Sequence, residues 1–204
     1  MRTNIRKTPR YCWVTTIATA VLLAAQAQES TTPAPPSSVE EQIPAEIDGE
    51  ELVRTKMQIF RSYEGEWDGV QSYASTEANP AFESKGGWTG SYQLDGMYFE
   101  LDGFSEFQSG KSLYRWMITY DIALKKYRAW TFNSNGIVTD WLAQYDPEKK
   151  ELTWHFADPR SGLRGWLTTQ ALPNVVTGHG MAKAEGARVL SDYRLSYTRK
   201  KLRI

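Results

Sequence analysis

From Tyr63 onward, apolar and polar side chains alternate in short segments separated by turn residues. Such alternation is typical of half-buried β-strands, because successive side chains point to opposite faces of a sheet. No proline lies inside a predicted strand, as a continuous ladder of backbone hydrogen bonds requires. Nine connections, and therefore ten strands, are predicted by the turn signals Asn79-Pro80, Asp95-Gly96, Ser109-Gly110, Leu124-Lys125-Lys126, Asn135-Gly136, Asp146-Pro147, Asp158-Pro159, Pro173-Asn174 and Glu185-Gly186.

The two faces of these strands differ in chemistry. One face carries charged residues such as Glu66, Asp68, Asp140 and Asp192. Ten strands with one charged and one aromatic face favour an all-β fold, a single antiparallel barrel, since closure removes the open edges of the sheet. The aromatic face is predicted to carry Trp67, Tyr73, Trp88, Tyr92, Phe99, Tyr114, Trp116, Tyr120, Trp130, Phe132, Trp141, Tyr145, Trp154, Phe156, Tyr193 and Tyr197.

Two segments precede the predicted domain. Positions 1–27 combine basic residues, an uncharged apolar run and an Ala25-Gln26-Ala27 exit, which together predict a secretory signal peptide. The run from Trp13 to Ala25 is shorter than the ~20 residues needed to span a bilayer. Positions 28–48 are rich in Pro, Ser, Thr and Glu and predict a disordered tether. We therefore expect an exported protein, periplasmic or extracellular, with no transmembrane span after cleavage.

The predicted folded domain covers residues 49–204 and begins with a helix over 49–62. Leu52, Met57, Ile59 and Phe60 indicate a short amphipathic helix with imperfect spacing, and Asp48 is the expected N-cap.

Charge and cysteine content exclude several classes of function. The chain has 24 Lys plus Arg against 24 Asp plus Glu, which argues against a nucleic-acid-binding protein. Its single cysteine, Cys12, excludes a disulfide framework and a Cys-based zinc site. Cleavage after Ala27 removes Cys12, so the core alone must stabilise the mature protein, which we expect to be a monomer.

The start of the first predicted strand carries a family resemblance. Gly65-Glu66-Trp67, behind a short helix, resembles the Gly-x-Trp signature of lipocalins and other calycins. The resemblance extends over about Leu52 to Lys201 to the exported bacterial calycin-like proteins grouped as domain-of-unknown-function family 1579. The segments that carry it are Gly65-Glu66-Trp67-Asp68-Gly69, Leu94-Asp95-Gly96, Tyr120-Asp121, Lys125-Lys126-Tyr127 and Tyr197-Thr198-Arg199-Lys200.

This resemblance implies a ten-stranded calycin-like barrel with Trp67 at its closed end and a basic side chain of a late strand over the Trp67 ring. Arg199 shares the parity of Tyr193 and Tyr197, so it is the candidate for this cation–π contact. The alternative is that Arg199 is a solvated charge near the chain end.

The resemblance further implies that the barrel holds a small apolar ligand, and an aromatic wall suits an apolar or ring-bearing molecule. The alternative is that the rings fill the interior. Arg128 shares the parity of Trp130, and an internal Arg128 would need an anionic partner such as a ligand carboxylate; the alternative is a position at the rim. The candidate ligand-binding residues are Trp88, Tyr92, Phe99, Trp116, Tyr120, Trp130, Trp141, Trp154, Arg128 and His179.

Histidines limit the possible chemistry. His155 is predicted on the outer face, and His179 shares the parity of Val175 and Met181, which would place it inside. Since some calycins of this strand number bind haem through one barrel histidine, His179 is the candidate haem ligand or catalytic group; a structural or solvent-facing His179 is the alternative. No Gly-x-Ser-x-Gly motif occurs, and no metal site is predicted. The favoured function is a non-enzymatic small-molecule carrier, with a haem protein or enzyme as the alternative.

Overall fold

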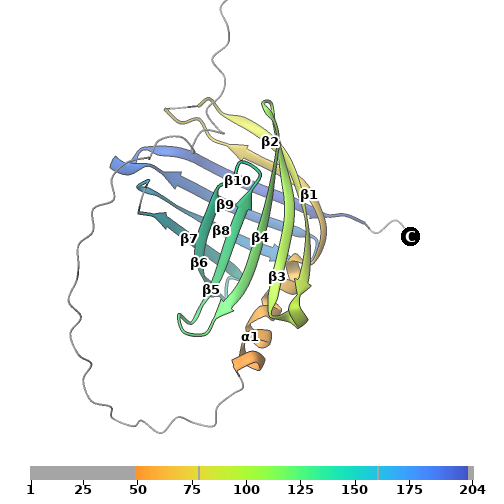
Figure 1. The fold of residues 1–204 in the computed structure, drawn as a ribbon. Coiled ribbons are helices and arrows are strands. Elements are labelled where there is room, and N and C mark those ends of the chain that lie inside the picture. Colours follow the sequence, from red (N-terminus) through yellow and green to blue (C-terminus); the bar gives the residue numbers. More distant parts are fainter. Residues whose placement is uncertain (1–48, 78, 160, 202–204) are drawn as a thin grey trace, which may run out of the picture.

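The structure is a computed structural model that describes residues 49–77, 79–159 and 161–201 (Figure 1). The predicted signal peptide (1–27), the predicted tether (28–48) and the expected N-cap Asp48 lie outside the described residues. In the described part, no helix combines the length and apolar character needed to cross a bilayer.

Ten antiparallel strands follow one another around a closed barrel, and β1 pairs with both β2 and β10 (Figure 1). The predicted ten-stranded antiparallel barrel is confirmed. The strands are β1 Gly65–Tyr73, β2 Phe82–Gln93, β3 Tyr98–Phe107, β4 Gly110–Asp121, β5 Lys126–Asn133, β6 Val138–Asp146, β7 Glu151–Asp158, β8 Leu163–Leu172, β9 Val175–Lys183 and β10 Val189–Arg199.

A short helical segment closes one end of the barrel. It consists of α1 (Gly49–Met57) and the 3₁₀ turn η1 (Gln58–Tyr63), which together match the predicted helix over 49–62. Two barrel tyrosines hold the end of α1, whose last carbonyls have no partner within the helix. Tyr92 Oη donates to Met57 O at 2.9 Å, and Tyr127 Oη donates to Lys56 O at 3.0 Å.

Trp67 lies under this helical segment and is fully buried. Its Nε1 donates to Tyr63 O at 3.1 Å. The guanidinium of Arg199 lies 4.5 Å from the centre of the Trp67 ring and donates to Ser62 O and Pro173 O at 3.1 Å each, and to Glu64 O. Arg199 is therefore bound at the closed end and is not a solvated charge.

Glycines on the inner face determine where the aromatic rings lie. Gly180 faces Tyr193 across β9 and β10, and a Cβ at Gly180 would lie 2.4 Å from Cζ of Tyr193. Gly103 is likewise opposite Tyr114, where a Cβ would lie 2.6 Å from the ring. Such pairs let a ring lie flat across the neighbouring strand, so the rings cover the wall without filling the interior.

We expect Arg199→Ala to lower the free energy of unfolding by about 3 kcal/mol, because it removes three charge-assisted hydrogen bonds and the cation–π contact. Urea denaturation measures the change. Arg194→Ala, at an exposed outward position of the same strand, is the control and should change stability by less than about 0.5 kcal/mol. Equal stability of the two variants would contradict the role given to Arg199.

We expect Gly180→Ala to destabilise the barrel by about 1–3 kcal/mol, because the new methyl group overlaps the Tyr193 ring. In a Tyr193→Ala background, Gly180→Ala should lower the free energy of unfolding much less, since the ring that the new methyl group would overlap is absent. Urea denaturation of the four proteins of this double-mutant cycle measures the coupling. A cost of Gly180→Ala that is the same in both backgrounds would show that the ring does not rest on this glycine.

Candidate functional site: an aromatic cavity in the barrel

The barrel encloses a cavity of about 1240 Å³. Phe60 and Tyr63 line it at the closed end. Thr76, Ser161 and Arg188 line it at the other end, in the connections that follow β1, β7 and β9. The volume exceeds the roughly 300–1,000 Å³ that is common for small-molecule sites. The aromatic rings therefore line the interior and leave room for a ligand.

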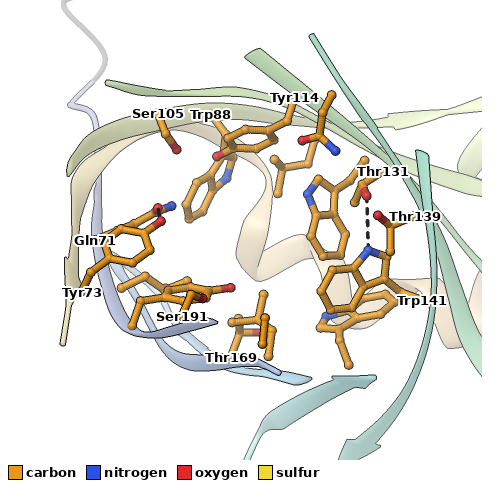
Figure 2. A pocket seen from close by; sticks show the side chains of 18 of the residues that line it. Gln71, Tyr73, Trp88, Ser105, Tyr114, Thr131, Thr139, Trp141, Thr169 and Ser191 are labelled. Atoms are coloured by element: carbon orange, nitrogen blue, oxygen red, sulfur yellow. Dashed lines mark hydrogen bonds between the residues drawn. The ribbon is translucent and has the colours of Figure 1, made fainter. Parts of the chain in front are cut away.

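A cluster of aromatic rings forms one side of the cavity. Trp116 lies 5.2 Å from Trp141 and 5.6 Å from Trp154, measured between ring centres. Trp141 Nε1 donates to Thr131 Oγ1 at 3.3 Å (Figure 2). Inward alternation of β4, β6 and β7 places these rings, since each strand directs every second side chain into the barrel. This cluster offers flat apolar faces to a ring-bearing molecule.

A hydrogen-bonded tyrosine network lies on the opposite side (Figure 2). Tyr73 Oη donates to Gln71 Oε1 at 2.7 Å, and Gln71 Nε2 donates to Tyr197 Oη at 2.7 Å. Burial raises the pKa of Tyr73, Tyr114 and Tyr193 well above the ordinary value, so these hydroxyls stay neutral across the physiological range.

The wall of the cavity is almost free of formal charge. Among its described lining residues, Arg188 is the one charged side chain, and it is exposed at the open end. No cluster of three or more His, Cys, Asp or Glu side chains occurs within the described residues to hold a metal ion. The wall can therefore provide apolar contact and neutral hydrogen bonds, and no acid, base or metal ligand is evident on it.

The ten predicted ligand-binding residues fall into three groups by position: five line the cavity, two belong to the closed end, and three face outward. Five line the cavity, namely Trp88, Phe99, Trp116, Trp141 and Trp154. Tyr92 and Tyr120 belong to the closed end and do not line the cavity, because Tyr92 holds α1 and Tyr120 packs 5.2 Å from Tyr127.

The predicted inward orientation of Trp130 is wrong, and Arg128, for which an internal and a rim position were both open, also faces outward. In β5 the buried residues are Tyr127, Ala129 and Thr131, so Arg128 and Trp130 face outward. Arg128 Nη2 lies 2.7 Å from Asp140 Oδ2, and its guanidinium lies 5.1 Å from the Trp130 ring centre. Arg128 therefore pairs with a protein carboxylate on the outer surface, and not with a ligand carboxylate inside the barrel. Both faces of β5 carry aromatic residues, so the presence of a large ring did not indicate which face is inside.

His179 does not point inward, so of the two interpretations the solvent-facing one is correct. The buried positions of β9 are Val176 and Gly180, so His179 lies on the outer surface. Its Nε2 is 2.7 Å from Asp192 Oδ1, and its ring meets the Trp166 ring edge-on at 4.8 Å. Val175 and Val176 are apolar at both parities, which made the alternation ambiguous. With His155 exposed as predicted, neither histidine can act inside the barrel.

Several lining residues were absent from the predicted site. Thr169 hydrogen-bonds Tyr63 at 2.8 Å at the closed end. Alternation places Tyr73, Tyr114, Tyr193 and Tyr197 on the inner face but does not show that they line a cavity. The glycines opposite Tyr114 and Tyr193 are the sequence signal that could have shown it. The lining residues that the prediction missed include Gln71, Tyr73, Ser105, Tyr114, Thr131, Thr139, Thr169, Ser191, Tyr193 and Tyr197.

No protein-family model matches the chain, and no curated protein matches it in sequence. Solved structures do resemble it. The S-type phycobiliprotein lyase CPES from Guillardia theta has a TM-score of 0.54 and 12% identity, over 76% of this chain and 99% of the lyase. Rv2717c from M. tuberculosis has a TM-score of 0.55 and 10% identity, over 71% of this chain and 97% of that protein. Together with the closed ten-stranded topology, these likenesses show that the chain folds as a calycin-like β-barrel.

Proposed function

We propose that this protein is a non-enzymatic binding protein or carrier for a small apolar or aromatic molecule, which occupies the barrel cavity. The cavity of about 1240 Å³ behind an aromatic wall is the observation that carries this proposal. Binding sites of this kind are concave and mainly apolar, with a few polar groups that orient the ligand. The Trp116–Trp141–Trp154 cluster and the hydrogen bonds around Gln71 supply these two elements.

The chemistry of the wall favours binding over catalysis. General acid–base catalysis needs a group whose pKa lies near the working pH. Among the described lining residues, the titratable groups are tyrosines and Arg188. Burial raises the pKa of Tyr63 to about 12 and the pKa of Tyr193 further, which removes them as bases at neutral pH. One of the similar structures is described as a phycobiliprotein lyase, and an identity of 12% gives no support for that activity here.

The expected setting of this carrier follows from the sequence. We propose that it is exported after cleavage of residues 1–27, acts as a monomer in the periplasm or outside the cell, and is related to the family-1579 proteins. The signal-peptide pattern of residues 1–27 supports export, and Gly65, Trp67 and Arg199 support the calycin relationship.

We expect N-phenyl-1-naphthylamine, an uncharged fluorescent aromatic probe, to bind the purified protein with increased dye emission and quenched tryptophan emission. Both signals arise because the dye enters an apolar cavity lined by indole rings. Titration of each signal gives the affinity.

Ala182→Trp tests whether the dye occupies the cavity, because Ala182 lines it. This variant should weaken dye binding by about tenfold or more, since the added ring takes up ligand space. Ala157→Trp carries the same change at an exposed outward position and is the matched control. An unchanged affinity in Ala182→Trp, or no dye binding at all, would refute the proposed site.

A further inference from the structure

We propose that the cavity selects an uncharged ring-bearing molecule that carries hydrogen-bond acceptors, such as a ketone or ester oxygen. This inference rests on the proposed function and specifies its ligand class. Two independent observations support it: the near absence of charge on the wall, and the presence there of unpartnered indole N–H groups, which can only donate.

The charge of the wall argues against an ionic ligand. Within the described lining residues, no Asp, Glu, Lys or His is available to pair with a buried charge. The raised pKa values of Tyr73, Tyr114 and Tyr193 mean that their hydroxyls do not become anions that could pair with a cation. Transfer of an unpaired charge from water into such a site is costly. Arg188 is exposed at the open end, where water and salt screen its charge.

The hydrogen-bonding groups of the wall determine what a neutral ligand should offer. Trp116, Trp154 and Tyr193 line the cavity, and within the described residues their indole N–H groups and hydroxyl make no hydrogen bond. Among the described side chains, the buried and unpartnered polar atom is Trp88 Nε1, so these three groups are not fully buried.

Indole N–H groups on the wall can only donate, whereas its hydroxyl groups can both donate and accept. Gln71 Oε1 already accepts from Tyr73, and Thr131 Oγ1 accepts from Trp141. An occupant with acceptor oxygens would satisfy donors that otherwise depend on water, and a pure hydrocarbon would leave them unpaired. Rings stacked on the Trp116–Trp141–Trp154 cluster would bring such oxygens close to Trp116 and Trp154.

Three naphthalenes with one common ring system test this selection. They are 6-propionyl-2-(dimethylamino)naphthalene, the corresponding 6-carboxylate, and the 6-propyl compound, which lacks the carbonyl. We expect the ketone to bind at least about tenfold more tightly than the carboxylate. It should bind about fivefold more tightly than the propyl compound, because one neutral hydrogen bond contributes about that factor to affinity. Fluorescence titration at pH 7 measures all three affinities.

Tyr193→Phe and Trp116→Phe each remove one donor and keep an aromatic ring. The variant that removes the group donating to the ketone should weaken ketone binding about fivefold. In Tyr193→Phe the affinity for the propyl compound should not fall, because the propyl compound makes no hydrogen bond with that hydroxyl. Tyr98→Phe is the matched control, because Tyr98 does not line the cavity. A ketone preference that survives both donor variants would overturn the assignment of donors.

The outcomes separate this inference from the proposed function. Binding of none of the three compounds overturns both. Equal binding of the ketone and the carboxylate overturns the charge selection and leaves the carrier proposal standing. If Arg188→Gln then weakens only the carboxylate, the occupant is an anion held at the open end. Equal binding of the ketone and the propyl compound overturns the requirement for acceptors.

Discussion

The contact between aromatic rings and cross-strand glycines is the constraint on which the interior depends. Tyr193 lies against Gly180, Tyr114 against Gly103, and neither ring could keep its place beside a residue with a Cβ. Because these rings lie along the wall, an aromatic-rich barrel keeps an open cavity of about 1240 Å³. Side chains of this size would otherwise meet in the middle, as they do in barrels whose interior is filled.

The two ends of the barrel have different chemistry. At the closed end, α1 and η1 bury apolar side chains against Trp67, and Arg199 joins this segment to the last strand through backbone carbonyls. Within the described residues no α-helix covers the other end, where Thr76, Ser161 and Arg188 line the cavity. The packed helical segment is therefore at one end of the cavity, and the exposed Arg188 is at the other.

Strand number, antiparallel order and the helix over 49–62 could be predicted because alternation and turn residues are local properties of the chain. The positions of Trp130 and His179 could not be predicted in this way. β5 and β9 carry apolar or aromatic side chains on both faces, and packing against the neighbouring strands determines which face points inward. Ala129 faces inward because a small side chain fits there, and Gly178 and Gly180 receive the side chains of Leu195 and Tyr193. The cavity itself depends on all ten strands together, so no local pattern could give its volume.

Closure of the barrel joins the two ends of the folded domain. Strands β2 to β9 pair only with their neighbours in sequence, whereas β1 must also pair with β10, with Trp67 opposite Arg199 at one end of that seam. Hairpins between consecutive strands form quickly because their loops are short, but the seam requires closure of a loop as long as the whole barrel. During synthesis, the barrel keeps two unpaired strand edges until β10 emerges. We therefore expect the seam to form late in folding, and a chain that lacks β10 to be prone to aggregation.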